Sequence, residues 1–273
     1  MLSFGARLRA VTAERGALCV GIDPHPQLLR AWGCTEDAAG LRRFCGTVVE
    51  ALGERVAVLK PQSAFFERYG SQGIAVLEWT LAAIRDTGAI ALLDAKRGDI
   101  GSTMAAYAAA YLDRTSPLAA DAITASPYLG FGSLHPLLAA AAVNGAGVFV
   151  LALTSNPEGV RVQHARTDAG STVAQEILDA VGTLNSGADP LGSVGVVVGA
   201  TIEDTGHDLS RLNGPVLTPG LGAQGATPEQ LRRLFGPVLA DVLPSTSRDV
   251  LRHGPDPQAL RAAVRTTLEQ LSG

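Results

Sequence analysis

The sequence predicts an α/β fold, a single-domain (β/α)₈ TIM barrel that covers residues 1–273. Three observations predict it. Eight short apolar runs alternate with longer segments whose apolar residues recur at helical spacing. The runs are apolar almost throughout, as in parallel strands that are buried on both faces. A length of 273 residues suits one barrel of this kind.

The expected strands follow one another at short intervals along the whole chain. They are residues 17–22, 56–59, 90–93, 121–125, 147–153, 194–200, 216–218 and 238–243. The last of these runs is flanked by Pro237 and Pro244, and proline is rare inside a sheet. An open, doubly wound sheet is the alternative fold, but the first strand is not followed by the G-x-G-x-x-G of a dinucleotide site.

The expected helices lie between these runs, at residues 35–52, 74–85, 104–112, 134–143, 173–184 and 228–235. Thr35, followed by Glu36 and Asp37, is predicted to cap the first of them. Thr227 is predicted to cap the last, with Pro228 at its first position. Residues 156–170 and 185–190 are rich in turn-forming residues and are expected to be loops.

Composition excludes several partners. A net charge of −4 without a basic block gives no footprint for nucleic acid. The apolar stretch 136–153 is interrupted by Asn-Gly-Ala-Gly at 144–147, and residues 1–10 lack the apolar centre of a signal peptide, so no membrane partner is expected. Three cysteines and five scattered histidines predict neither a disulfide framework nor a metal site, which fits a cytoplasmic protein.

The chain has 20 arginines and only two lysines, Lys60 and Lys96. A codon preference for arginine accounts for the ratio, but the two retained lysines are then exceptions. Arginine stays protonated in proteins, whereas a lysine amine can exchange its proton. Both lysines fall at the carboxyl ends of expected strands, where such barrels carry their active sites. We therefore expect them to take part in proton transfer or in a close ammonium contact.

The densest polar cluster, Asp94-Ala95-Lys96-Arg97-Gly98-Asp99, directly follows the strand expected at 90–93. Asp94 and Lys96 are two residues apart, so they project to the same side while the strand continues. Neighbouring carboxylates keep a lysine protonated, which argues against a Schiff base and favours a general acid. A solvated charged loop is the alternative for this motif alone, and its position after an apolar strand favours catalysis.

Two loops near the carboxyl terminus predict a phosphate site. Residues 217–226 contain three glycines, whose backbone N–H groups can approach an anion, and they lead into the helix expected at Thr227. The segment Ser-Thr-Ser-Arg at 245–248 adds hydroxyls and a guanidinium. Each loop alone is equally typical of a flexible turn. Together, in the place where these barrels usually bind phosphate, they predict a phosphorylated substrate.

These motifs resemble the orotidine 5′-monophosphate decarboxylase family. The matching segments are Gly21-Ile22-Asp23-Pro24, Leu59-Lys60-Pro61-Gln62, residues 94–99 and residues 219–224, which together span most of the barrel. The form Asp-Ala-Lys-Arg-Gly-Asp-Ile-Gly is similar to the longer bacterial (type 2) branch. The additional segment around 156–190 departs from the compact members.

The resemblance implies a reaction and its catalytic residues. The reaction is the decarboxylation of orotidine 5′-monophosphate to uridine 5′-monophosphate and CO₂, without a cofactor or metal, as the last step of pyrimidine synthesis de novo. Lys96 would protonate the C6 carbanion, with Asp94 beside the substrate carboxylate. Asp99 and Thr103 would reach the site of a neighbouring subunit, which implies a homodimer with shared active sites.

The resemblance also implies the substrate contacts. Asp23 and Lys60, the latter also counted among the catalytic residues, would hold the ribose hydroxyls. Ser155 would contact the pyrimidine, with Thr154 as the alternative one residue earlier. The remaining substrate-binding residues are Pro219, Gln224 and Arg248, of which the last two would bind the phosphate.

Two other functions are weighed against this one. A magnesium-dependent sugar-phosphate enzyme of the same barrel group shares D-x-K-x-x-D, but it has a carboxylate at the end of the second strand, where this chain has Lys60. An ammonium at that place repels a divalent cation. A non-catalytic nucleotide-binding protein would keep the pocket without turnover, yet every member of the catalytic set is present in this sequence.

Overall fold

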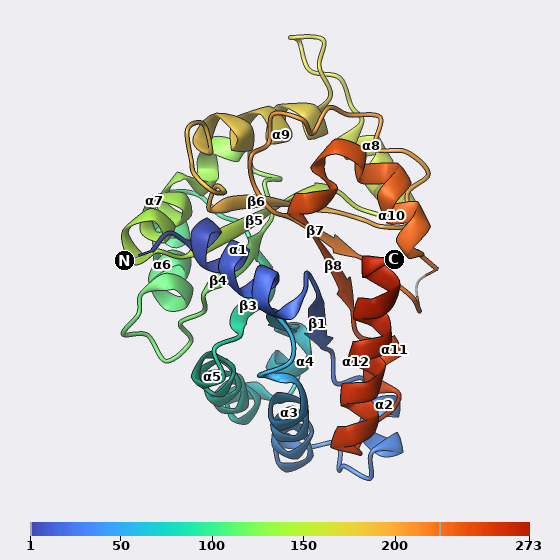
Figure 1. Cartoon of the computed structure of the whole chain (residues 1–273). Coiled ribbons are helices and arrows are strands. Elements are labelled where there is room, and N and C mark those ends of the chain that lie inside the picture. The colour runs from blue at the N-terminus through green and yellow to red at the C-terminus, as the bar shows by residue number, and fades with distance from the viewer. Residues whose placement is uncertain (1, 224) are drawn as a thin grey trace.

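The computed structural model describes residues 2–223 and 225–273, and within them eight parallel strands close into a barrel in the order β1 to β8 (Figure 1). The strands are β1 (Cys19–Ile22), β2 (Val58–Pro61), β3 (Ile90–Arg97), β4 (Ala122–Ala125), β5 (Gly147–Leu153), β6 (Val194–Val198), β7 (Val216–Pro219) and β8 (Val242–Thr246). The predicted (β/α)₈ barrel is therefore confirmed. Pairing of β1 with β8, Cys19 opposite Ser245, closes the ring.

Helices surround the barrel and connect its strands. They are α1 (Phe4–Arg15), α2 (Pro26–Ala31), α3 (Ala38–Leu52), α4 (Ala64–Glu67), α5 (Gly70–Asp86), α6 (Gly101–Leu112), α7 (His135–Asn144), α8 (Val160–Gln163), α9 (Val173–Leu184), α10 (Pro228–Phe235), α11 (Arg248–Leu251) and α12 (Pro257–Ser272). Short 3₁₀ helices are η1 (Phe131–Leu134), η2 (Pro157–Gly159) and η3 (Gly236–Asp241). None of the helices in the described residues is long and apolar enough to cross a membrane.

The apolar core has two parts, divided by the wall of the barrel. The larger part lies between the strands and the surrounding helices, and it includes the buried faces of α3, α5 and α9. The smaller part fills the barrel itself with alternate strand residues such as Val58, Leu92 and Phe149. Because strand residues alternate between these two parts, nearly every strand position is buried, as the continuous apolar runs require.

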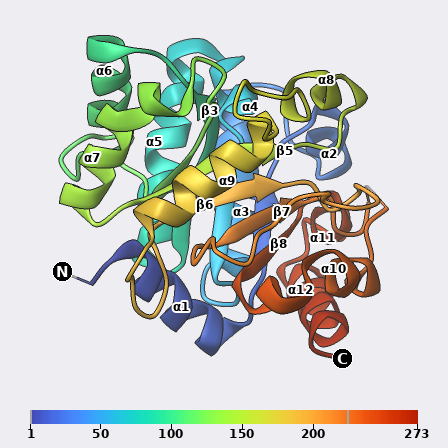
Figure 2. The same ribbon diagram turned by 90° about the horizontal axis from the view of Figure 1, so that it is seen from above.

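Helix α1 closes the amino-terminal end of the barrel (Figure 2). Phe4, Leu8 and Val11 lie on one side of this helix and pack into the inner core. The ring of Phe4 meets that of Phe149 edge to face, with centroids 6.0 Å apart. A Cβ at Gly147 would collide with the Phe4 ring, so glycine is required at the start of β5.

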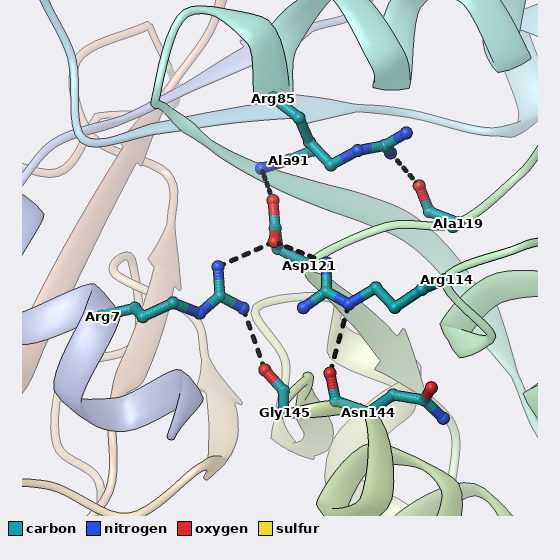
Figure 3. A network of polar contacts seen from close by, with 8 residues as sticks. All are labelled: Arg7, Arg85, Ala91, Arg114, Ala119, Asp121, Asn144 and Gly145. Atoms are coloured by element: carbon teal, nitrogen blue, oxygen red, sulfur yellow. Dashed lines mark hydrogen bonds and ion pairs between the residues drawn. The ribbon is translucent and has the colours of Figure 1, made fainter. Parts of the chain in front are cut away.

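A buried carboxylate holds α1 in place at this end (Figure 3). Asp121, just before β4, accepts hydrogen bonds at Oδ1 from Arg7 of α1, at 2.8 Å, and from Arg114, at 3.2 Å. Its Oδ2 accepts from the backbone N–H of Ala91 at 3.0 Å. Arg7 also donates to the carbonyl of Gly145 at 2.9 Å. The buried charge is thus fully paired, as its burial demands.

The position of the last strand and the cap of α3 differ from the sequence predictions. The last strand is Val242–Thr246, not residues 238–243, because residues 236–241 form η3 and Pro244 lies inside the strand. Helix α3 is capped by Asp37, whose side chain accepts from the N–H of Gly40 at 2.8 Å, whereas Thr35 donates to Asp37. The cap predicted at Thr227 is confirmed, since its side chain accepts from the N–H of Gln230.

Candidate active site

A cavity of about 570 Å³ opens at the carboxyl ends of the strands. Such a volume suits a small-molecule ligand. Its lining includes seven of the residues singled out in the sequence: Asp23, Lys60, Asp94, Lys96, Ser155, Pro219 and Arg248. These residues come from the ends of six different strands, so the closed barrel brings together positions that lie up to 225 residues apart in the sequence.

Asp94 stands between the two lysines of the chain. Lys60 Nζ lies 2.8 Å from Asp94 Oδ2, and Lys96 Nζ lies 2.6 Å from Asp94 Oδ1. The hydroxyl of Thr124 also donates to Asp94 Oδ1, at 2.8 Å. The side chains of Lys60 and Asp94 are 7% and 9% exposed, whereas that of Lys96 is 44% exposed. Lys96 is therefore the more accessible of the two ammonium groups that line the cavity.

Burial and charge act in opposite directions on this array. Burial raises the pKa of the Asp94 carboxyl, but the ammonium groups of Lys60 and Lys96 outweigh it and hold that pKa below its ordinary value. Burial lowers the pKa of Lys60, and the charges of Asp94 and Asp23 outweigh it, so the pKa of Lys60 is held above its ordinary value. Both groups consequently remain charged at neutral pH.

The backbone is irregular where the array is built. Strand β3 continues to Arg97, beyond the end at Leu93 that the sequence predicts, and its register against β4 shifts between these two residues. Lys96 has a φ of +48°, a left-handed conformation that is uncommon outside glycine. The backbone N–H of Lys96 donates to Thr124 Oγ1 at 3.0 Å. This irregular turn, held by Thr124, places the Lys96 ammonium against Asp94.

Asp23 follows β1. Lys60 lies on β2, which is the strand between β1 and the Asp94-bearing β3. The charge of Asp23 contributes to the pKa of Lys60, and its Oδ1 has no hydrogen-bond partner among the described residues. The hydroxyls of Thr246 and Ser247, after β8, are likewise buried and without a partner within that part of the chain. All three side chains line the cavity, so they supply polar groups to a ligand there.

The two loops predicted to bind phosphate form one side of the cavity. Pro219, Gly220, Leu221 and Ala223 come from the loop after β7, and residues 245–248 come from the end of β8. Gly220 has a φ of +121°, a conformation that requires glycine. Arg248 is exposed at the start of α11. Gln224, the other predicted phosphate ligand, lies outside the described residues.

Two candidate residues lie away from the cavity. Asp99 and Thr103 are not among the described residues that line it. Asp99 Oδ1 accepts from the backbone N–H of Ile100 at 2.8 Å, and Thr103 is exposed on α6. Neither side chain makes a hydrogen bond or ion pair with Lys96 among the described residues.

Sequence reasoning missed two polar residues of the site, Gln62 and Thr124. The Gln62 amide nitrogen, in the orientation that satisfies its neighbours, lies 3.0 Å from Asp94 Oδ2. Gln62 lies two residues beyond Lys60, and Thr124 is the polar residue of an otherwise apolar strand. Both signals are present in the sequence, but the pairing of β2 and β4 with β3 is needed to connect them with Asp94.

The described residues contain no group of three or more His, Cys, Asp or Glu side chains that could hold a metal ion. At the centre of the cavity, the donor oxygens of Asp94 already contact two ammonium groups. A divalent cation there would have to displace a lysine and would face its charge.

Comparison with known proteins supports a single assignment. A family model described as "Orotidine 5′-phosphate decarboxylase / HUMPS family" matches residues 16–263. The orotidine 5′-phosphate decarboxylase of Salinispora arenicola is 64% identical over 268 residues, which cover 98% of this chain and 96% of that protein. The protein of the same name from Streptomyces coelicolor is 60% identical over 265 residues, covering 97% and 95%.

The solved structures agree. A crystal structure from Streptomyces avermitilis, assigned as an orotidine 5′-phosphate decarboxylase, has a TM-score of 0.97 at 58% identity and covers 100% of this chain and 95% of that one. The structure of the Leishmania donovani OMP decarboxylase has a TM-score of 0.77 at 32% identity, covering 99% and 98%. The chain belongs to the orotidine 5′-phosphate decarboxylase / HUMPS family and, with these full-length relatives, to the carboxy-lyases within it.

Proposed function

We propose that the protein converts orotidine 5′-monophosphate to uridine 5′-monophosphate and CO₂, without a cofactor, and that Lys96 donates the proton. The observation that carries this proposal is the array of Asp94 between Lys60 and Lys96 in a cavity that the loops after β7 and β8 also line. The product is a pyrimidine nucleotide, so the reaction belongs to pyrimidine synthesis. Three buried cysteines, with no disulfide among the described residues, support a reducing cytoplasm.

The chemistry follows from the charges of the array. When the bond between C6 and the carboxylate breaks, its electron pair stays on C6 and CO₂ departs. Lys96 Nζ then gives a proton to C6, since it is the exposed ammonium of the pair. Asp94 stays ionised and places a negative charge near the substrate carboxylate, an unfavourable contact that ends when CO₂ leaves.

The substrate contacts divide along the cavity. Asp23, whose Oδ1 is unpaired among the described residues, and Lys60 lie on the β1–β2 side and suit the ribose hydroxyls. Arg248 and the glycine loop after Pro219 suit the phosphate. Gln224, which lies outside the described residues, is assigned to the phosphate from the sequence alone.

Ser155 is the better candidate for the pyrimidine contact. The hydroxyl of Thr154 already bonds to Asn156 and to Gln163, at 2.6 and 2.7 Å. Ser155 is exposed to the cavity beside it.

A homodimer with shared sites accounts for Asp99 and Thr103, which are not among the described residues that line the cavity of their own chain. Large apolar side chains are exposed nearby: Ile100 is 62% exposed and Tyr128 80% exposed, with Leu129 beside it. Exposed apolar groups of this size are typical of a contact surface. We propose that a second copy covers them and that Asp99 completes the neighbouring site.

The test uses purified protein and orotidine 5′-monophosphate, with and without EDTA, and follows the ultraviolet absorbance that the pyrimidine loses on decarboxylation. We expect rapid loss that EDTA does not change. Lys96→Ala should lower kcat by about 10³-fold, the usual scale for a general acid, while uridine 5′-monophosphate still binds.

Lys96→Arg is the matched control, because it keeps the positive charge beside Asp94 but does not release a proton. It should be as inactive as Lys96→Ala. A Lys96→Ala rate within tenfold of the wild type would contradict the role of Lys96. Turnover of a sugar phosphate only with magnesium would instead establish the metal-dependent alternative.

A further inference from the structure

The segment that follows β5 is built into the rim of the cavity. The segment of residues 156–172, of which 156–170 were expected from the sequence to be a loop, contains η2 and α8 and lies at the end of the barrel opposite α1 (Figure 2). Asn156, the first residue of this segment, lines the cavity together with Thr154 and Ser155. The rest of the segment contributes no side chain to the array of Asp94, Lys60 and Lys96.

Gln163, the last residue of α8, turns its amide back onto the end of β5. Its Oε1 accepts the backbone N–H of Thr154 at 2.9 Å, and its Nε2 donates to Thr154 Oγ1 at 2.7 Å. The amide therefore bonds both the backbone and the side chain of one residue. Gly159 allows this contact, because a Cβ there would lie 2.7 Å from Thr154 Oγ1 and 3.0 Å from Gln163 Nε2.

The residue after Thr154 is also held from its other side. A Cβ on Gly199, beyond the end of β6, would lie 3.0 Å from the backbone nitrogen of Ser155 and 3.2 Å from its Cβ. The N–H of Gly199 donates to the carbonyl of Leu153 at 2.9 Å. Ser155 thus lies between a close contact with β6 and a neighbour that Gln163 fixes. Its position depends on both.

Helix α8 is itself anchored from behind. After Gln163, the His164 ring lies edge to face with the His207 ring, with centroids 5.1 Å apart. His207 in turn bonds Thr172 Oγ1 at 2.7 Å, and Arg166 donates to the carbonyl of Gly170 at 2.7 Å. The contacts of His207 join the segment to the loop after β6, and the bond of Arg166 lies within the segment. Together they hold α8, and with it the Gln163 amide, in place.

We propose that Gln163 is a positioning residue, which fixes the end of β5 so that Ser155 meets the pyrimidine ring of the substrate. The inference rests on the proposed function and deepens it, because it assigns base recognition to the segment that follows β5. Gln163 acts through Thr154 and Ser155 and does not line the cavity among the described residues. Small misplacement of a contact group costs activity without any loss of the group itself.

The test compares Gln163→Ala with Gln175→Ala. Gln175 is a matched control, because its amide, like that of Gln163, accepts from and donates to a single residue. It accepts from Asp208 N at 2.9 Å and donates to Asp208 O at 3.0 Å, and it does not line the cavity among the described residues. Two ligands are titrated into each variant: uridine 5′-monophosphate, which carries the base, and ribose 5-phosphate, which lacks it. We expect Gln163→Ala to weaken the nucleotide about tenfold and to leave ribose 5-phosphate within twofold.

A double variant that combines Gln163→Ala with Ser155→Ala tests whether Gln163 acts through Ser155. If Gln163 acts by placing Ser155, the double variant binds the nucleotide as weakly as Ser155→Ala alone, because the loss is not additive for coupled residues. Additive losses, equal weakening of both ligands, or the same loss in Gln175→Ala would overturn the proposal.

Gln163→Glu gives a second variant, which keeps the acceptor for the N–H of Thr154 but loses the donor to its hydroxyl, whose own proton goes to Asn156 Oδ1. It should bind the nucleotide more tightly than Gln163→Ala and more weakly than the wild type, and an affinity no better than that of Gln163→Ala in a folded protein would also overturn the proposal. These outcomes are separate from the proposed function. Decarboxylation by the wild-type protein tests that function, whatever Gln163 does.

Discussion

At the scale of single residues, Asp94 organises the site. Its lowered pKa means that its stabilising charge is present above its unfolded pKa of roughly 3.9 and is lost as the pH falls toward the folded value. The raised pKa of Lys60 means that its contribution is present below roughly 10.4 and is lost as the pH rises through the folded value. The charged array is therefore complete across neutral pH before any substrate binds, which is the preorganisation that catalysis requires.

Lys60→Met should move the acid limb of the profile of kcat/KM against pH to higher pH. The substitution removes one of the two ammonium groups that lower the pKa of Asp94, and Asp94 then takes up a proton more readily. The position of the limb is the measurement, since the height of the profile also reflects lost ribose contacts.

Thr124→Val is the control for that shift, because it removes a hydrogen bond to Asp94 but no charge. It should move the limb less than Lys60→Met does. An acid limb that stays in place in Lys60→Met would show that Asp94 does not depend on Lys60.

The sequence placed Asp94, Lys96 and Lys60 at strand ends because the strands are apolar and the lysines few. It did not connect Thr124 or Gln62 with them, since that contact depends on how neighbouring strands are aligned. The contact between Lys96 and Asp94 was expected from strand alternation. It arises instead from a left-handed residue, a feature that residue type alone does not indicate.

At the scale of elements, α1 is one of the helices that the sequence analysis did not identify, as is the carboxyl-terminal α12. The apolar residues of α1 are few and separated by arginines, so the helical pattern is weak, yet Phe4 and Leu8 fill the end of the barrel. Helices α9 and α10 have the bounds that were predicted, because threonine caps mark their starts. Strand β8 was misplaced because Pro244 was taken as a flank, although the strand includes it.

Arg7→Ala should lower the free energy of unfolding by about 1–2 kcal/mol and leave kcat unchanged. Asp121 loses one charged donor, but its carboxylate still accepts hydrogen bonds from Arg114 and from the N–H of Ala91. Unfolding in urea measures the loss. The active site lies at the opposite end of the barrel and should not respond.

Arg9→Ala on the same helix is the control. Arg9 pairs with Asp241 at a more exposed place, where an ion pair contributes less. If Arg9→Ala destabilises the protein as much as Arg7→Ala, the burial of Asp121 is not what makes the Arg7 contact strong.

At the scale of the whole molecule, the two ends of the barrel differ: one holds the active-site cavity and the other is closed by α1. Helix α1 occupies the amino-terminal end, and the cavity opens at the other, so the nucleotide and CO₂ use the same opening. The exposed apolar side chains Ile100, Tyr128 and Leu129 follow β3 and β4, the strands whose carboxyl ends point to this end of the barrel. A second subunit placed over them would bring its Asp99 toward the cavity.

A mixture of Lys96→Ala and Asp99→Ala proteins should therefore regain activity. With free exchange, half of the dimers are mixed, and each has one site with both Lys96 and Asp99, which gives about a quarter of the wild-type rate. The rate of the mixture, against those of the separate proteins, is the measurement. Lys96→Ala mixed with Lys96→Arg is the control, since none of its sites is complete. An inactive first mixture, with exchange demonstrated, would place Asp99 in the site of its own chain.

The scarcity of lysine also gives the protein a selective chemical handle. Of its two lysines, Lys60 is enclosed by the array and Lys96 is 44% exposed at the cavity. A reagent that acylates lysine amines on the folded chain will thus modify Lys96 in preference to Lys60. A fluorophore or mass tag attached in this way would lie at the mouth of the cavity, and a bound nucleotide would protect the amine from it. The labelling rate then reports occupancy directly.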